Sequence, residues 1–344
     1  MDRTVALVGA SHPAARALAL ALEAEPDVTR VLGLASSAPP LLGPKFEYAR
    51  LTGRDRLAAQ VEGAQVVVVF PWLDVGARDQ EAHGAAMLAD LDRLLEGVQA
   101  AGRTERLVLW SSGVVYGAHA DNPVPLREQD PLRPTADFPA AGRLAELEGR
   151  VLRLRGPATV VLRPAAVWAP EWGTFLARGL QAPALLGVRG TDPPVQALHP
   201  ADATSALLLA VRGTSSGVYN VAPADHVAAS EAARLAGRRR VVVPEQLARA
   251  GAERLWELGV AAAPPGQLRY LAHPWVLDAG RLAAEGWAPS VSTAAALGEA
   301  GRRRRDALVL GRLTVRRADV YRGVAAGVAT AAMMAAARRR VRRR

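Results

Sequence analysis

The chain has 344 residues, half of them hydrophobic, which is enough for one large domain or two closely joined ones with a core. It has no cysteine, so disulfides, thiolate metal sites and cysteine nucleophiles are excluded, and its six histidines show no metal-ligand spacing. The formal net charge of +10 lies in residues 302–344, which carry fourteen arginines and a net charge of +12, so residues 1–301 are near neutral at −2.

Strand-like and helix-like segments alternate through the first half of the chain. We expect strands at 3–8, 29–35, 65–70, 106–112 and 158–167, and helices at 13–25, 54–62, 81–101 and 140–154. The strand at 65–70 is apolar without interruption, as in a parallel sheet with both faces covered. The alternation predicts an α/β fold with a doubly wound, Rossmann-like parallel sheet. The first apolar run is short and leads into a turn, so we expect no signal peptide and a bacterial-type cytoplasmic protein.

Beyond Trp168 the pattern becomes irregular, with glycine, proline and tryptophan interruptions. A helix is expected from Asp202, which is a good N-cap residue type, and one more strand at 217–222. We therefore predict a Rossmann core at 1–170, a small C-terminal, substrate-side lobe at 171–301 with a returning core strand near 217–222, and an arginine-rich tail at 302–344.

Several short stretches resemble the extended short-chain dehydrogenase/reductase family, the NAD-dependent sugar-nucleotide epimerases and dehydratases. They follow the family's order over residues 3–297: VALVGAS at 5–11, VEGAQVVVVF at 61–70, LVLWSSGVVYG at 107–117, EQDPLRPTADF at 128–138, VVLRPAAVWAP at 160–170, ALHPADATSALLLA at 197–210, GVYNVA at 217–222 and LDAGRLAAEGWAPSVSTAAAL at 277–297. The resemblance implies a Rossmann fold, NAD or NADP as cofactor, and a nucleotide-linked or other small polar ligand.

The family's chemistry uses a tyrosine as proton donor and acceptor, a lysine four residues later and a Ser or Thr that orients the substrate. By resemblance, Ser112 is retained, whereas the tyrosine position falls on Phe138 and the lysine position on Gly142. Phenylalanine has no proton to exchange, so the general acid/base is missing. Arg143 lies beside Gly142, but its pKa is too high for proton transfer at neutral pH. Tyr116 is a poor substitute, because the family has a tyrosine there in addition to the catalytic one.

The cofactor loop is altered in the same way. By resemblance, the cofactor-binding positions are Gly9, Ser11, His12, Ala15 and Ala35. His12 places a side chain where the second glycine would let a pyrophosphate approach, and Pro13 lacks an N–H that could face a phosphate. Ala35 stands where an acidic residue would bind the adenosine ribose, and no arginine is at hand for a 2′-phosphate. The stretch is thus either a weakened cofactor site or a plain strand-to-helix connection.

Four tryptophans lie at or near the C-terminal ends of predicted strands: Trp72, Trp110, Trp168 and Trp172. Ligands bind at that edge of an open α/β sheet. The tryptophans could line an aromatic ligand pocket, or they could fill the space left by an absent nicotinamide.

The tail contains fifteen uncharged residues, 323–337, between Arg322 and Arg338. As a helix this segment would be ~22 Å long against a hydrocarbon core of roughly 30 Å, so we expect no transmembrane span. The tail could be an exposed basic helix, or it could bind an anionic membrane surface or another polyanion. Gly323 and Gly327 form a GxxxG spacing, which can let two helices pack closely, so a homodimer is also possible.

Three functions remain open from the sequence. The first is an epimerase/dehydratase-like protein with lost or weakened redox activity that acts by binding a ligand or partner. The second is an active NAD(P)-dependent oxidoreductase or epimerase that uses Ser112 with an unusual acid/base. The third is a peripheral protein targeted by residues 302–344.

Overall fold

The computed structural model describes residues 3–39, 43–51, 57–71, 80–169, 172, 184–258, 261, 264–302, 307–310 and 313–316. The centre of this part of the chain is a seven-stranded sheet in the order β3-β2-β1-β4-β5-β6-β9, with every neighbouring pair parallel. The strands are β1 (Arg3–Val8), β2 (Val28–Ala35), β3 (Phe46–Arg50), β4 (Val66–Val69), β5 (Arg106–Trp110), β6 (Ala158–Pro164) and β9 (Gly217–Val221). The strand order reverses between β1 and β4, which confirms the predicted doubly wound fold.

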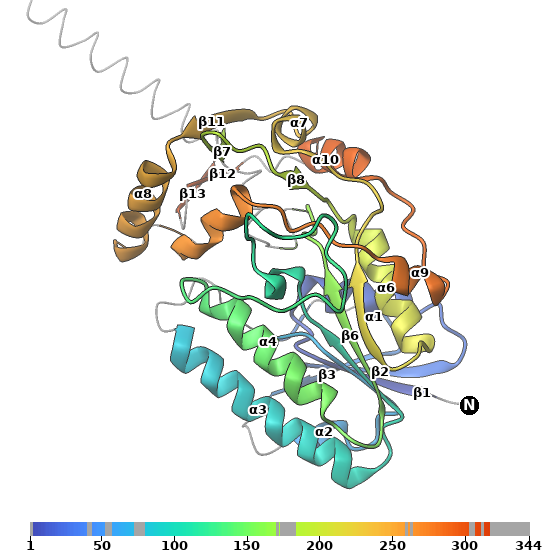
Figure 1. The fold of residues 1–344 in the computed structure, drawn as a ribbon. Helices are drawn as coiled ribbons and strands as arrows, with labels where there is room; N and C mark the ends of the chain where they lie inside the picture. Colours follow the sequence, from blue (N-terminus) through green and yellow to red (C-terminus); the bar gives the residue numbers. More distant parts are fainter. Residues whose placement is uncertain are drawn as a thin grey trace, which may run out of the picture.

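Helices cover both faces of the sheet (Figure 1). The helices on one face are α1 (Pro13–Leu22) and α6 (Pro200–Arg212), and those on the other are α2 (Leu57–Val61), α3 (Gln80–Ala101) and α4 (Pro139–Leu152). Because successive strand residues point to opposite faces, Val5 and Leu7 of β1 pack on the first side and Ala6 and Val8 on the second. The sheet is therefore buried between two apolar cores, as the uninterrupted apolar strands predicted.

The edge strand β3 was not predicted from the sequence. Its residues are mostly exposed, and only Phe46 is buried among the core side chains. A strand at the edge of a sheet buries one side at most, so its sequence lacks the apolar pattern that identified the central strands. Phe46 packs so closely under β2 that a Cβ on Gly33 would lie 2.3 Å from its ring.

The C-terminal half adds small sheets and short helices above the C-terminal edge of the main sheet (Figure 1). The strand pairs are β7 (Ala184–Val188) with β11 (Arg239–Val243), parallel, and β8 (Pro194–Val195) with β10 (Val227–Ala228), antiparallel. The helices are α7 (Ala229–Leu235), α8 (Glu245–Glu257), η4 (Pro265–Leu271), α9 (Gly280–Ala284) and α10 (Thr293–Arg302), and η2 (Gly113–Tyr116) follows β5. The sequence had not indicated these strand pairs.

The expected N-cap of α6 was wrong. The helix begins at Pro200, and its cap is His199, whose Nδ1 accepts from the Ala201 N–H at 3.2 Å. Asp202 lies inside the first turn and is 2% exposed. Its carboxylate accepts hydrogen bonds from the Ser290 N–H and O–H and from the Val291 N–H. Asp202 therefore fastens the segment before α10 to the Rossmann core.

Within the predicted tail, two short antiparallel strands pair: β12 (Ala307–Leu310) and β13 (Leu313–Arg316). The sequence had predicted no strand there. The segment 323–337, considered above as a helix, lies outside the described residues, as does Trp72. Among the residues that the structure describes, no helix is both long and apolar enough to cross a membrane.

Candidate functional site

The turn between β1 and α1 keeps its first glycine for a steric reason. Gly9 has a φ of +87°, and a Cβ there would lie 2.3 Å from the carbonyl oxygen of Phe70. The N–H groups of Gly9 and Ala10 both donate to the Leu34 carbonyl, each at 2.9 Å. The turn is thus held against the ends of β2 and β4, in the position of a dinucleotide-binding loop.

The N-terminus of α1 is capped by its own residues. The His12 N–H donates to the Gly9 carbonyl at 2.9 Å, and the Ala14 N–H donates to His12 Nδ1 at 3.1 Å. Pro13 lies between them and has no N–H. A phosphate at a helix N-terminus is bound by free N–H groups of the first turn. Here two of these groups are already used and a third is absent.

The imidazole of His12 belongs to an aromatic cluster at the C-terminal ends of the strands. It stacks on Phe70, with ring centroids 5.6 Å apart, and meets the edge of Trp172 at 6.5 Å. Trp172 in turn contacts Trp110 edge-on at 6.5 Å, and both indoles are buried. Burial lowers the pKa of His12 to about 4, so the ring is neutral at pH 7. Neutral aromatic side chains therefore lie next to the loop where a pyrophosphate would bind.

The position expected from the resemblance to bind the adenosine ribose is Ala35, at the end of β2. It is buried, and its carbonyl accepts from the Tyr48 hydroxyl at 3.1 Å. The strand register places Arg50, an exposed residue of β3, directly beside Ala35. The expectation that no arginine is at hand for a 2′-phosphate therefore needs correction. Arg50 was missed because strand β3, which brings it next to the end of β2, was not predicted from the sequence.

The catalytic positions expected from the family lie at the starts of η2 and α4. Ser112 caps η2, and its Oγ accepts from the Val114 N–H at 3.4 Å. Phe138 precedes α4, is 3% exposed and meets the ring of Tyr270 edge-on at 5.8 Å. Gly142 lies inside α4, and a Cβ there would meet no described atom within 4 Å. The structure thus retains room at position 142, whereas the ring at position 138 is packed into the core.

Tyr116 has a structural role. Its hydroxyl donates to Asn220 Oδ1 at 2.9 Å and accepts from the Arg163 guanidinium at 2.8 Å, and its side chain is fully buried. Burial raises the pKa of this phenol, which makes it a poorer proton donor at neutral pH. Arg163 also donates to both carboxylate oxygens of Glu148, which accepts from the Ser111 hydroxyl at 2.5 Å. Tyr116 therefore belongs to a buried polar network that joins α4 to β5, β6 and β9.

Sequence reasoning missed this network. Its signals were Arg163 within the apolar strand β6 and Glu148 on the buried face of α4. Both side chains are at most 5% exposed, and a charge so deep in a core requires a partner. The network fixes the helix that carries positions 138 and 142 relative to the sheet.

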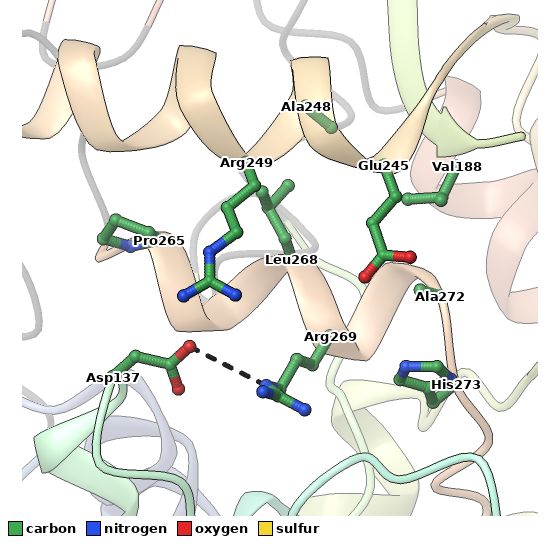
Figure 2. A pocket seen from close by; sticks show the side chains of 10 residues that line it. All are labelled: Asp137, Val188, Glu245, Ala248, Arg249, Pro265, Leu268, Arg269, Ala272 and His273. Carbon is green, nitrogen blue, oxygen red and sulfur yellow. Dashed lines mark ion pairs between the residues drawn. The ribbon is translucent and has the colours of Figure 1, made fainter.

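A small charged pocket is lined by Asp137, the residue before Phe138 in the chain (Figure 2). It lies between α8 and η4, and the side chains of Arg249 and Arg269 point toward Asp137, which forms an ion pair with Arg269 at 3.7 Å. Its volume is about 40 Å³, which is room for a water molecule but not for a sugar or nucleotide.

A larger pocket of about 200 Å³ lies among β7, β8, α7 and η4, and Trp168 is part of its wall. Of the tryptophans predicted at the strand ends, Trp168 lines this cavity together with Trp275. Trp172 instead contacts His12, and Trp110 contacts Trp172. Within the described ranges, no cluster of three or more potential metal ligands exists.

The chain was compared with protein families, curated sequences and solved structures. No protein-family model matches it. Uncharacterised proteins from Mycobacterium tuberculosis (strain H37Rv) and Mycobacterium bovis are 28% identical over 256 residues, covering 70% of this chain and 68% of theirs.

The solved structures similar to this chain include several with bound NAD. The UDP-glucose 4-epimerase of Thermus thermophilus in complex with NAD is 19% identical, with a TM-score of 0.65, covering 87% of this chain and 99% of that one. The dTDP-glucose 4,6-dehydratase of Bacillus anthracis with NAD is 14% identical, with a TM-score of 0.64 and coverages of 87% and 96%. A short-chain dehydrogenase/reductase superfamily protein of Agrobacterium tumefaciens with bound NAD is 18% identical, with a TM-score of 0.62 and coverages of 87% and 96%. The chain has the fold of the NAD-dependent epimerases and dehydratases, which confirms the fold that the resemblance implied.

Proposed function

We propose that this protein has the epimerase/dehydratase fold without effective redox chemistry and acts by binding a small ligand or a partner. The observation that carries the proposal is Phe138. It occupies the position of the family's proton-transferring tyrosine, and its ring is buried against Tyr270. No hydroxyl is available there, and the neighbouring phenol, Tyr116, is held in the buried network.

The cofactor site gives independent support. NAD binding in this fold depends on free N–H groups at the start of α1. Of these, the Ala14 N–H is used by the His12 cap, the His12 N–H donates to the Gly9 carbonyl, and Pro13 has none. The ribose-binding acid is replaced by Ala35, and the lysine that would hold the nicotinamide ribose is replaced by Gly142. The residues present therefore do not fit NAD in the way the fold ordinarily binds it.

The test is a calorimetric titration with NAD and NADP, combined with an assay for epimerisation of UDP-glucose. We expect no binding at micromolar concentrations and no turnover by the unmodified protein. His12→Gly removes the cap and frees the Ala14 N–H, so it should tighten the binding of either cofactor. His226→Gly, at an exposed histidine outside the cofactor loop, is the matched control.

Phe138→Tyr with Gly142→Lys restores the two catalytic residue types but leaves the cap of α1 in place. We expect this double variant to remain inactive unless His12→Gly is added. Micromolar binding of NAD or NADP by the unmodified protein, or its turnover of UDP-glucose, would support the active oxidoreductase instead. Stronger binding of NADP than of NAD would further assign Arg50 to the 2′-phosphate.

A further inference from the structure

Exposed apolar side chains gather in one part of the C-terminal half. Most of the large apolar side chains that are exposed in the described part of the chain belong to β7, β11 and α8: Leu186, Val241, Val242, Leu247, Leu255 and Leu258. The others are scattered singly over α1, β3, α4 and the loop after η2. Single exposed apolar residues are normal in proteins, whereas a contiguous apolar surface marks a site of interaction.

The leucines of α8 share one side of the helix. With 3.6 residues per turn, Leu258 at the C-cap differs in direction from Leu247 by only ~20°, and Leu255 differs from it by ~80°. Leu247 is 67% exposed, whereas the small Ala248 is the residue that this helix buries. The helix therefore packs on η4 and presents an apolar stripe beside that contact.

The strand pair that precedes α8 is exposed in the same way. Only Pro244 separates β11 from α8, and β11 pairs with β7 so that Val241 lies directly beside Leu186. Paired neighbours point to the same face of a sheet, and both of these side chains are exposed. Parallel strands are normally covered on both faces, so this face of the pair lacks its usual cover among the described residues.

The basic segment of the chain begins beside this surface. Gly301 of α10 lies against the end of α7, where a Cβ on Gly301 would be 2.6 Å from the Ala236 carbonyl oxygen (Figure 1). Ala236 is the C-cap of α7, and the run of arginines 238–240 follows two residues later and leads into β11. Residues 302–344, with their net charge of +12, therefore start next to the arginines that precede the exposed valines.

The acidic residues of α8 are accompanied by arginines. Glu253 pairs with Arg249 at 2.9 Å, and Glu257 pairs with Arg254 at 3.2 Å. Glu245 points into the small charged pocket, which Arg249 also lines (Figure 2). The negative charges of α8 are thus matched by neighbouring arginines and do not cancel the charge of the basic segment.

We propose that β7, β11 and α8 form a docking surface for an anionic lipid bilayer. The basic segment attracts the bilayer, and the exposed leucines and valines enter the boundary between headgroups and acyl chains. A nucleic acid would match the arginines but not the leucines, and a neutral apolar partner would match the leucines alone, whereas an anionic bilayer matches both. The proposal goes beyond the ligand-binding function proposed above and does not depend on it.

The absence of cysteine allows a direct test, because a single introduced cysteine can carry an environment-sensitive fluorophore such as NBD. Leu255→Cys reports on the proposed surface, and Leu20→Cys, at a similarly exposed leucine of α1, is the matched control. Vesicles of phosphatidylcholine and phosphatidylglycerol in equal parts should raise and blue-shift the fluorescence at position 255 and leave that at position 20 unchanged. Vesicles of phosphatidylcholine alone should change neither.

A second measurement uses the unlabelled full-length protein. Leu247→Gln with Leu255→Gln should weaken sedimentation with the acidic vesicles by about tenfold, because two leucines lose their apolar contact with the bilayer. Leu20→Gln with Leu152→Gln, at exposed leucines of α1 and α4, should leave it unchanged.

The docking surface and the basic segment can fail separately. Sedimentation with acidic vesicles without a fluorescence change at position 255 would leave the basic segment as the anchor and overturn the docking surface. Equal binding by the two double-glutamine variants would also overturn it. Dimerisation in the absence of lipid that Leu247→Gln with Leu255→Gln abolishes would assign the surface to a second copy of the chain instead.

Discussion

The imidazole of His12 lies nearly parallel to the ring of Phe70, with 21° between the two planes and 5.6 Å between the centroids. The same imidazole caps α1 through Nδ1, so it must be neutral at that nitrogen to accept the Ala14 N–H. Protonation would remove the cap and place a buried cation among aromatic rings and at the positive end of the helix.

This arrangement predicts a specific loss of stability in acid. Burial lowers the pKa of His12 from 6.5 to about 4, so the unfolded chain takes up this proton at a higher pH than the folded protein. The contribution to stability is therefore fully present above pH 6.5 and is lost as the pH falls toward 4, by about 1–3 kcal/mol, a range that allows for the residue being partly exposed.

The measurement is the free energy of unfolding in urea at several pH values between 7 and 4. His12→Asn is the control, because asparagine caps a helix but does not titrate. The difference between the two profiles isolates His12 from the carboxylates that also titrate in acid. Parallel profiles for the two proteins would contradict the prediction.

A second prediction concerns Gly9 and Gly142. Gly9→Ala should destabilise the protein by several kcal/mol, because the φ of +87° disfavours alanine and the new Cβ would collide with the Phe70 carbonyl oxygen. Gly142→Ala is the matched change inside α4, where a Cβ meets open space, and it should stabilise the helix by about 0.5–1 kcal/mol. Thermal unfolding of both variants checks the opposite signs.

The buried network of Glu148 and Arg163 gives a third prediction. Glu148→Leu leaves Arg163 charged and unpaired in the core, so we expect a loss of about 3–5 kcal/mol. Glu146→Leu, on the exposed side of the same helix, removes ion pairs to Arg143 and Arg150 and should cost less than about 1 kcal/mol. Similar losses for both variants in chemical denaturation would refute the assignment of Glu148 to the core.

The last prediction concerns residues 302–344. This segment carries a net charge of +12, whereas residues 1–301 carry −2, so we propose that any attraction to anionic lipid or another polyanion comes from it. Binding to acidic vesicles should fall with salt, because the Debye length is about 8 Å at physiological ionic strength, and should be lost on truncation after Gly301. Sedimentation with vesicles tests this, and equal pelleting of the full-length and truncated proteins would exclude an electrostatic anchor.

The central sheet could be predicted because its strands are apolar on both faces. The run of four valines in β4 is an example, with every side chain buried. The edge strand β3 could not, because a strand that is mostly exposed leaves no apolar pattern. The pairing of β7 with β11 joins two segments far apart in the chain, and neither the spacing nor the composition of the two segments predicts that contact.

The N-caps of α1 and α6 could not be predicted from the sequence. His12 and His199 each precede a proline, and each accepts the N–H two residues later through Nδ1. Histidine is an uncommon N-cap residue, whereas aspartate is a common one, so the sequence favours Asp202 as the cap of α6. For the same reason, the sequence shows that His12 adds a side chain to the loop but does not show its hydrogen bond. The replacements at Phe138 and Gly142 were visible in the sequence, whereas the Trp168 pocket depends on residues brought together only by folding.

The polar character of β3 has a consequence for the behaviour of the protein in concentrated solution. An open parallel sheet ends in strands with unpaired backbone groups, and such edges can recruit a second chain and start aggregation. On β3 the exposed Glu47 pairs with Arg30, and Arg50 lies at the strand's end. At the opposite edge, Arg281 lies over the ring of Tyr219, a residue of β9. Charged side chains at both margins therefore disfavour edge-to-edge stacking of copies, and replacing Glu47 and Arg50 with valine would remove that protection on one side.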